Sequence, residues 1–352
     1  AKFRLGPVAS FLPAMWRPLV RFMLAREVRG VNDVPGMQAV IESYMDRMIE
    51  QSSSGFSVSG LEHLEPERAY LFISNHRDIT LDPAFTNYAL HTSGRDTVRI
   101  AIGDNLLTKP WTSDLMRLNK SFIVKRSVSG PRELLAASRT LSRYIRHSIQ
   151  EENAPVWIAQ REGRAKDGVD RTEPVIIKML SMSRDKKSES FEEQMHGLRI
   201  VPVSISYELD PCDGAKAREL HQIASTGSYE KGEQEDLASI ALGISGNKGR
   251  VHVTFGTPLL PDLDSPEAVA AAIDAQVIAG YCLHPTNLFA YRRLYGAGVT
   301  LPDDLYVEHG DVTENEFNAR IDALPAEHRD YALAIYANAV VSKLAAATAS
   351  GE

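Results

Sequence analysis

Short apolar runs, each followed at once by a polar or charged cluster, constrain the fold of this chain more than any other feature. These runs span residues 56–60, 69–73, 97–102, 122–124, 156–159, 198–208 and 249–258. Their lengths and their content of β-branched and aromatic residues are typical of buried strands. Helical patterns stand between or beside them at 38–49, 83–90, 133–149 and 265–281. This alternation predicts an α/β protein with a mixed central β-sheet flanked by helices.

The same pattern divides the chain into three parts. We predict an N-terminal helical region over residues 1–55, an α/β domain over 56–262 and a helical C-terminal region over 263–352. A chain of 352 residues can bury a sizeable core. Its net charge of -7 argues against nucleic acid as a partner. Its two cysteines, Cys212 and Cys282, lack the spacing of a metal site, so we expect no metal, no disulfide framework and a reducing compartment.

The N-terminal region carries the apolar stretch 8–28, which prolines and arginines interrupt. It is too broken for a transmembrane span, and no small-residue cleavage site marks it as a signal peptide. Trp16 and Phe22, with arginines between the apolar residues, suit an amphipathic helix at a membrane interface. The alternative is a helix that packs on the α/β domain and leaves a few arginines at the surface.

The most informative polar cluster runs from Ser74 to Pro83, directly after the run 69–73. Ligands of open α/β sheets bind at the carboxyl ends of strands, where this cluster should lie. His76 could act there as a general base, with Asp82 or Asp78 orienting it and stabilising its positive charge. The simpler alternative for Asp82 is that it caps the helix beginning near Pro83. Asp82 could cap the helix and orient His76 at the same time. Asn75 and Arg77 are further possible contacts.

Cationic side chains gather where two later runs end. They are Lys125 and Arg126 after 122–124, and Arg164 with Glu162 and Gly163 after 156–159. Arginine binds phosphate oxygens in a bidentate way that lysine cannot match, so Arg126 and Arg164 are our candidates for a phosphate site. Glycine lets backbone approach a ligand, and we expect Glu162 to pair with a cation or cap a turn because a buried lone charge is costly. Further possible contacts are Lys120, Arg161, Lys166 and Pro202.

A basic block stands out against the acidic balance of the whole chain. Between Arg117 and Arg146 it contains Lys120, Lys125, Arg126, Arg132, Arg139 and Arg143, with the single acid Glu133. Such a block indicates an anionic ligand, an anionic protein partner or a lipid surface. The simpler alternative is a solvated helix face for its arginines.

Taken in order, four of these clusters resemble the motif blocks of the glycerolipid acyltransferases. The blocks are His76 with its following Asp, Ser121–Arg126, Glu162–Arg164 and Val201–Val203, within roughly residues 56–260. One departure is the spacing, since the family has four residues between His and Asp and here five, residues 77–81, precede Asp82. We favour Asp82 over Asp78 because a loop absorbs one added residue easily.

The resemblance implies acyl transfer from a thioester of coenzyme A or acyl carrier protein to the hydroxyl of glycerol-3-phosphate, without a cofactor. It also implies that His76 is the base, that the Asp supports it, and that Arg126, Arg164 and Lys125 hold the phosphate. Alternatives are acylation of lysophosphatidate or another lysolipid, and a non-catalytic lipid-binding or membrane-tethering protein. Long acyl chains imply work at a membrane, so we expect peripheral attachment to the cytoplasmic face through the N-terminal region.

Overall fold

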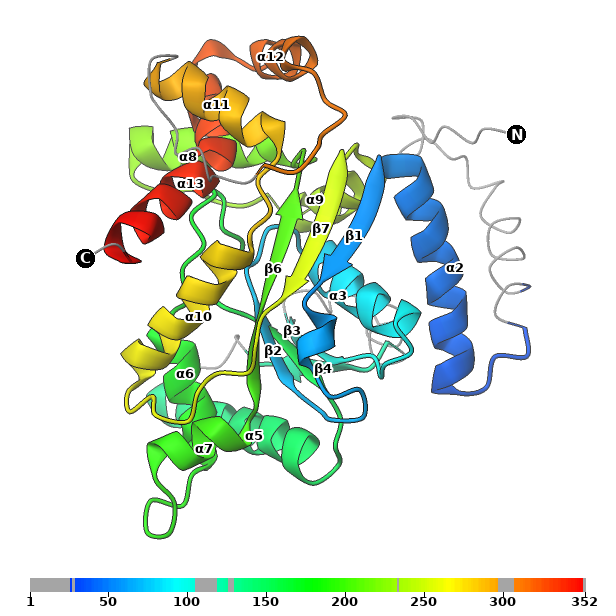
Figure 1. Ribbon diagram of the computed structural model, residues 1–352, viewed down its shortest axis with the longest axis vertical. Coiled ribbons are helices and arrows are strands. Elements are labelled where there is room, and N and C mark those ends of the chain that lie inside the picture. The colour runs from blue at the N-terminus through cyan, green and yellow to red at the C-terminus, as the bar shows by residue number, and fades with distance from the viewer. Residues whose placement is uncertain are drawn as a thin grey trace.

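The computed structural model describes residues 26, 29–104, 119–125, 130–232, 234–296 and 307–350. These residues form a seven-stranded sheet with helices on both faces (Figure 1). Its strands are β1 (Gly55–Ser59), β2 (Leu71–Ser74), β3 (Arg99–Gly103), β4 (Ser121–Val124), β5 (Val156–Ala159), β6 (Ile200–Tyr207) and β7 (Arg250–Phe255). The α/β fold with a mixed sheet is therefore confirmed. The amphipathic helix predicted around Trp16 and Phe22 lies outside the described residues.

The strand order across the sheet is β1-β7-β6-β2-β5-β3-β4. The five neighbours from β6 to β4 run parallel, while β7 pairs antiparallel with β6 and parallel with β1. All residues of β2 and β6 are buried, as expected of strands covered on both faces, whereas every second residue of β7 is only half-buried. The carboxyl ends of the five parallel strands share one edge, and the predicted polar clusters of β2, β4 and β5 follow that edge.

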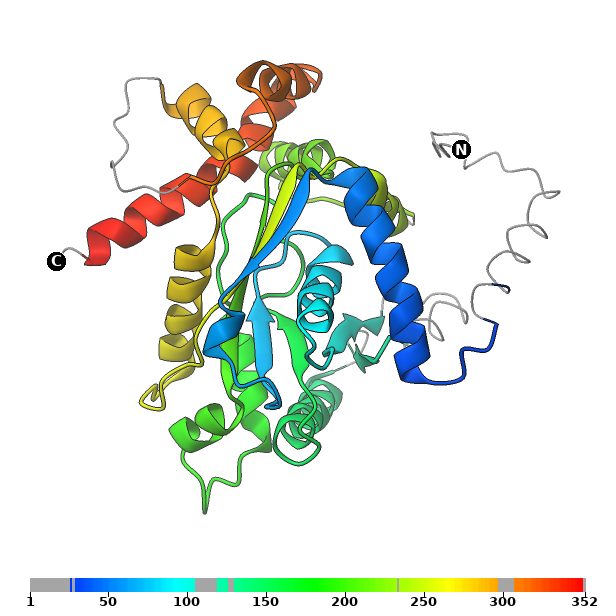
Figure 2. The ribbon, with the colours of Figure 1, turned by 45° about the vertical axis from the view of Figure 1, so that its right-hand side comes forward.

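Helices cover both faces of the sheet and extend beyond it (Figure 2). They are α2 (Val34–Ser52), α3 (Leu81–Thr92), α5 (Pro131–Gln150), α6 (Pro174–Leu180), α7 (Phe191–Gly197), α8 (Asp213–Thr226), α9 (Glu235–Ser245), α10 (Pro266–Gly280), α11 (Pro285–Tyr295), α12 (Glu314–Asp322) and α13 (Ala326–Ser350). Helices α2 and α3 pack on one face, in a core that includes Phe72 and Phe85. Helices α5, α6 and α10 pack on the other, around Ile73 and Ile273.

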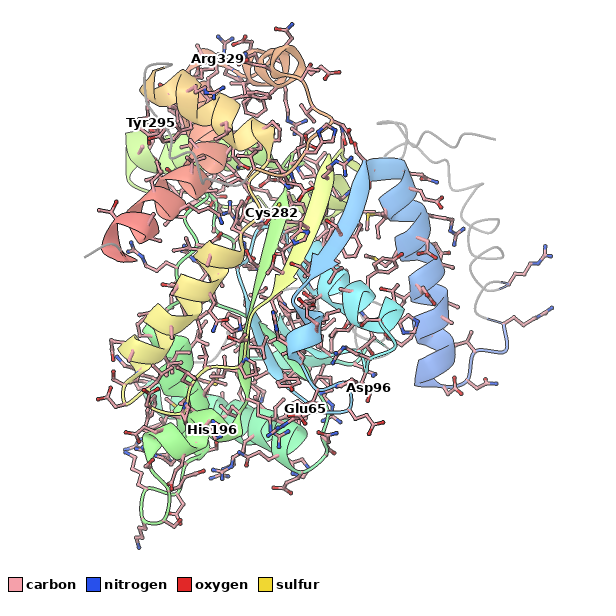
Figure 3. The ribbon with its side chains drawn as sticks, viewed as in Figure 1. Glu65, Asp96, His196, Cys282, Tyr295 and Arg329 are labelled. Atoms are coloured by element: carbon pink, nitrogen blue, oxygen red, sulfur yellow. The ribbon has the colours of Figure 1, made fainter. Side chains whose placement is uncertain are left out.

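The C-terminal helices build a third core with α8. Its buried side chains include Phe317 and Tyr336, whose rings meet edge to face at 5.1 Å. Helix α13 is, within the described residues, the one helix long and apolar enough to cross a membrane, over Ala326–Thr348. Part of it is buried in this third core, as in the core helix of a globular domain. Cys282, labelled in Figure 3, lies just after α10, and both it and Cys212 are free and buried.

Candidate active site

His76 and Asp82 form a hydrogen-bonded pair at the carboxyl end of β2. Nδ1 of His76 lies 2.9 Å from Oδ2 of Asp82. The Asp82 side chain is fully buried, and the His76 side chain keeps 14% of its surface exposed. With Nδ1–H donated to the carboxylate, Nε2 is the nitrogen left to accept a proton. This is the geometry that a histidine base and its orienting carboxylate require.

The Asp82 carboxylate is held by the turn that joins β2 to α3. Its Oδ2 accepts hydrogen bonds from the backbone N–H of Arg77 at 2.6 Å and of Asp78 at 2.9 Å. Its Oδ1 accepts from the hydroxyl of Tyr207 at 2.8 Å, at the end of β6. Burial above all, and then the charge of Asp82, raises the pKa of Tyr207 well above its ordinary value. The tyrosine therefore stays protonated and remains a donor to Asp82.

Asp78 has a structural position of its own. Its Oδ1 accepts from the backbone N–H of Thr80 and of Leu81, both at 2.9 Å, at the start of α3. The N-cap prediction for Asp82 is thus wrong, because Thr80 is the N-cap residue and Asp82 lies inside the first turn. Asp78 also packs on α9, where a Cβ at Gly243 would approach its carboxylate to 2.3 Å. Burial, followed by the charge of Asp82, raises the pKa of Asp78.

Arg77 and Asn75 anchor the backbone on either side of His76. The Arg77 guanidinium is buried and binds Asp170 through Nε at 3.0 Å and Nη2 at 2.6 Å. The Asn75 amide donates to Asp170 and to the carbonyl of Ile205, and it accepts from the N–H of Ile205. Both predicted contact residues therefore hold the fold together, and neither lines the cavity described next.

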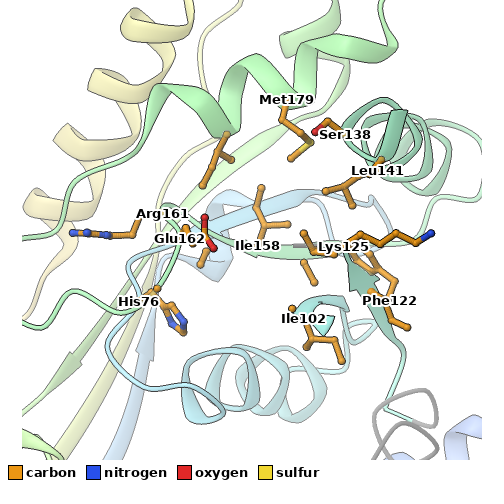
Figure 4. Close-up of a pocket in the computed structure, with 18 of the residues that line it drawn as sticks. His76, Ile102, Phe122, Lys125, Ser138, Leu141, Ile158, Arg161, Glu162 and Met179 are labelled. Carbon is orange, nitrogen blue, oxygen red and sulfur yellow. The ribbon is translucent and has the colours of Figure 1, made fainter. Parts of the chain in front are cut away.

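A cavity of about 1130 Å³ opens beside His76 at the carboxyl edge of the sheet. Figure 4 shows His76, Arg161 and Glu162 at one end, and Lys125 at the other. The wall between them is apolar and combines side chains from β3, β4, β5, α5 and α6. Those labelled in the figure are Ile102, Phe122, Leu141, Ile158 and Met179. The site therefore joins a polar end, where the histidine lies, to a long apolar compartment.

The loop after β5 brings three of the predicted cations to the cavity, Arg161, Arg164 and Lys166. Arg164 and Lys166 line it, on either side of Ala165, whose backbone N–H donates to the His76 carbonyl at 2.7 Å. The Arg164 guanidinium reaches Ser239 of α9 at 3.4 Å, at the long limit of a hydrogen bond. Lys166 forms an ion pair with Glu219 of α8. Arg164 is thus less committed to a protein partner than Lys166.

Glu162 differs from the expectation, whereas Gly163 agrees with it. We expected Glu162 to be buried and therefore to need a partner, but its side chain is exposed at the cavity. The assumption of burial is wrong. Gly163 has a positive φ of 72°, and no other atom lies within 4 Å of where a Cβ would be, which leaves room beside its backbone. Lys125 lies across the cavity from His76 in Figure 4. Arg126 is outside the described residues.

Two further predicted contacts, Lys120 and Pro202, do not line the cavity. Lys120 precedes β4, at the opposite end of that strand, and its ammonium binds the carbonyl of Thr97 at 3.2 Å. Pro202 lies within β6 opposite Ile73, and its carbonyl accepts from Gly256. The Val201–Val203 block is consequently part of the sheet and not a cluster at a strand end. Within the described part of the chain, no three His, Cys, Asp or Glu side chains gather as a metal site would require.

Three residues that support the pair were not predicted. Tyr207 and Asp170 reach Asp82 and Arg77 from far along the chain. Trp157 of β5 lies edge-on to the His76 ring at 6.1 Å, and its Nε1–H donates to the Ser74 hydroxyl. Tyr207 had one signal in the sequence, because it is a tyrosine at the end of an apolar run predicted to be a buried strand. No local pattern in the sequence marks Asp170.

Comparison with known proteins gives a family match for part of the chain. Residues 55–206 match the family model described as Acyltransferase. That match spans β1 to β6 and confirms the resemblance drawn from the four motif blocks. A solved structure, the 1-acyl-sn-glycerophosphate acyltransferase PlsC from Thermotoga maritima, aligns over 77% of this chain and 88% of that chain. Its identity of 15% and TM-score of 0.40 are too low to carry an inference. A search of curated proteins finds no match.

Proposed function

Because residues 55–206 match the acyltransferase family model, we propose that this chain transfers a fatty acyl group from a thioester to the hydroxyl of glycerol-3-phosphate. The observation that carries this proposal is the His76–Asp82 pair at the polar end of a largely apolar cavity. A pair of this kind activates a hydroxyl, and an apolar compartment suits a long acyl chain.

In the proposed reaction, Nε2 of His76 takes the proton of the acceptor hydroxyl as its oxygen attacks the thioester carbonyl. The new C–O ester bond forms, the C–S bond breaks, and the proton passes from His76 to the departing thiolate. Asp82 keeps Nδ1 protonated and balances the positive charge of the imidazolium. A positioned general base of this kind contributes about a hundred- to ten-thousand-fold in rate. No covalent enzyme intermediate and no cofactor are needed.

The charged walls of the cavity support a phosphate-bearing acceptor. Arg164 and Lys166 lie in the loop that is bonded to the His76 backbone, so a phosphate held there would keep its glycerol hydroxyl near Nε2. Lys125 remains a proposal for a contact at the other end of the cavity. Arg126, which lies outside the described residues, remains a proposed phosphate ligand. The donor would be coenzyme A or acyl carrier protein, and the reaction would take place at the cytoplasmic face of the cell membrane.

A second candidate acceptor is lysophosphatidate or another lysolipid. The cavity opens through a partly apolar rim, where Val175 and Leu134 are 62% and 53% exposed. Such a rim could accommodate the acyl chain that a lysolipid already carries, in addition to the chain of the donor. The phosphate and the reacting hydroxyl would be used in the same way in both cases.

An acyl-transfer assay distinguishes these acceptors. Acyl-coenzyme A and acyl carrier protein donors would be offered with glycerol-3-phosphate and lysophosphatidate in parallel, to the native protein and to His76→Ala. Product from glycerol-3-phosphate, lowered at least about a hundredfold in the variant, supports the proposal. Product from lysophosphatidate alone supports the second candidate. If neither acceptor yields product while the melting temperature is normal, other lysolipids are offered next. Failure with those as well supports a lipid-binding or membrane-tethering protein instead.

The role of Arg164 has a matched control in Lys120. Loss of one hydrogen bond to a charged group raises KM by about tenfold or more, so Arg164→Ala should weaken acceptor binding by that factor and donor binding much less. Lys120→Ala should leave the KM of both substrates unchanged, because Lys120 lies at the far end of β4. A change confined to the donor KM in Arg164→Ala would contradict the phosphate role.

A further inference from the structure

The two peptide groups on either side of Arg77 both donate to the Asp82 carboxylate. The peptide that joins His76 to Arg77 donates its N–H to Oδ2 at 2.6 Å, and the peptide that joins Arg77 to Asp78 donates its N–H to the same oxygen at 2.9 Å. Oδ2 also bonds Nδ1 of His76. Because three donors share one carboxylate oxygen, the orientation of both peptides decides where that oxygen lies.

The carbonyl oxygens of the same two peptides are held from outside the turn. The His76 carbonyl accepts from the backbone N–H of Ala165 at 2.7 Å. The Arg77 carbonyl accepts from Nζ of Lys216, in α8, also at 2.7 Å. A buried peptide that is bonded through both its N–H and its C=O loses a hydrogen bond when it rotates, which is costly. Lys216 therefore fixes the orientation of the peptide between Arg77 and Asp78.

Lys216 is a buried cation that acts on the protein and not on a ligand. Its side chain is 1% exposed, and it is not among the described residues that line the cavity. Its ammonium forms an ion pair with Asp210. Apolar side chains of the same size often stabilise a fold as well as a buried ion pair does, so stability alone does not explain this pair. What an apolar side chain cannot supply is a donor for the Arg77 carbonyl.

We propose that Lys216 is a positioning residue for the His76–Asp82 pair, acting through the peptide between Arg77 and Asp78. Its ammonium holds the carbonyl of that peptide, and the N–H of the same peptide holds Oδ2 of Asp82. Oδ2 in turn holds the ring of His76. The inference rests on the proposed function, because it assigns one more residue to the same reaction.

This assignment extends the reactive centre along the chain. Lys216 follows the segment that matches the family model, residues 55–206, and it belongs to the helix that forms the third core with the C-terminal helices. The pair of the α/β domain therefore depends on a side chain from α8, beyond the matched segment.

The two halves of the ion pair provide a matched comparison of rates. Lys216→Met removes the donor to the Arg77 carbonyl, so the peptide can turn and the Asp82 carboxylate loses one of its donors. A displacement of about 1 Å can lower a rate about a hundredfold, so we expect kcat to fall about tenfold to a hundredfold, with little change in the KM of either substrate. Asp210→Asn breaks the same ion pair but leaves the lysine bonded to the carbonyl, so kcat should stay within about threefold of native.

A measurement that needs no substrate reports on the pair directly. The proton between Nδ1 of His76 and Oδ2 of Asp82 gives a low-field signal in proton NMR, which is assigned by its absence in His76→Ala. A fixed pair protects this proton from exchange with water, and a loosened pair protects it less. A hydrogen bond from a charged group contributes at least about tenfold to such an equilibrium, so Lys216→Met should speed the exchange by about that factor or more. Asp210→Asn should leave the exchange rate close to native.

Arg320→Gln controls for a general loss of stability. Arg320 also binds α8, through an ion pair with Asp213, and it reaches the carbonyl of Asp210 and not the turn after β2. Every variant is measured well below its own melting temperature. If Lys216→Met does not fold, the double variant Lys216→Met with Asp210→Asn, which buries no lone charge at this site, takes its place.

Three outcomes overturn the proposal. They are a kcat of Lys216→Met within about threefold of native, an equal loss of kcat in Asp210→Asn or Arg320→Gln, and an unchanged exchange rate of the ring proton in Lys216→Met. The exchange measurement uses no substrate. It therefore decides the role of Lys216 even if no acceptor yields product, and the two proposals fail separately.

Discussion

The Asp82→Asn substitution isolates the negative charge beside His76 from its hydrogen bonds. Oδ2 of Asp82 accepts from the backbone N–H groups of Arg77 and Asp78 as well as from His76. An asparagine must place its oxygen there, because its NH₂ group in that position would face two N–H donors. The NH₂ group then points at the Tyr207 hydroxyl, which can accept a hydrogen bond. The variant therefore keeps the tautomer of His76 and loses only the charge.

The size of the effect follows from the 2.9 Å distance between Nδ1 and Oδ2. Two unit charges at that separation attract by about 6 kcal/mol at an effective dielectric constant of about 20. The least the charge should contribute is the difference between a charged and a neutral hydrogen bond, about 1–1.5 kcal/mol. We expect a loss between these limits, about 2–4 kcal/mol, which lowers kcat by roughly thirtyfold to a thousandfold.

The assay is kcat for acyl transfer at saturating donor and acceptor, compared between native protein and Asp82→Asn. KM should change little, because Asp82 is fully buried and touches no substrate. Asp82→Ala serves as the contrast, since it also leaves two backbone N–H groups unpaired and should lower the melting temperature. If Asp82→Asn kept kcat within about threefold of native, the charge would play no part in the reaction and our reasoning would be refuted.

Three further variants test two residues that hold the site in place, Tyr207 and Asp170, and the buried His284. Tyr207→Phe leaves one oxygen of the buried carboxylate unpaired, so urea unfolding should show a loss of about 1–3 kcal/mol; an unchanged midpoint would contradict this. Asp170→Asn leaves the buried charge of Arg77 without its partner, so we expect the free energy of unfolding to fall by about 3–5 kcal/mol. An unchanged free energy of unfolding would show that the ion pair does not stabilise the fold. Burial above all lowers the pKa of His284 to about 4. The unfolded chain then binds this proton first on acidification, so stability should fall by about 3 kcal/mol between pH ~6.5 and pH ~4. The His284→Phe variant should lose less stability than the native protein over that pH range. Equal losses in the two proteins would show that His284 does not cause the pH dependence.

Local patterns were sufficient to predict the strands and the place of His76, but not the partner of His76. Each strand overlaps one of the predicted runs, and His76 follows one of them, so its place at the carboxyl edge needed no tertiary information. Asp82 could be preferred over Asp78 only with the family resemblance, because Asp82 departs from the family's spacing by one residue and a loop absorbs one residue easily. The structure shows the turn between β2 and α3 wrapped around the Asp82 carboxylate, with two backbone N–H groups donating to it.

What could not be predicted depends on contacts between distant segments. The path of the loop after β5 brings Asp170 to Arg77, and no periodicity in the sequence encodes that path. Lys120 was grouped with Lys125 by closeness in sequence, but β4 separates them and places them at opposite ends of the strand. Glu162 was assigned a partner on the assumption of burial, which only the packing of the loop decides.

The hydrogen bond from Ala165 to the His76 carbonyl has a consequence for how enzymes on this framework can diverge. The residues on either side of Ala165 line the end of the cavity proposed to hold the acceptor, so an insertion or deletion in that loop would shift His76 and the proposed acceptor site together. The α5 and α6 rim is free of this linkage, because within the described structure its residues make no backbone hydrogen bond to His76. New lipid preferences are therefore expected to arise by substitution along the rim, while the loop stays fixed in length.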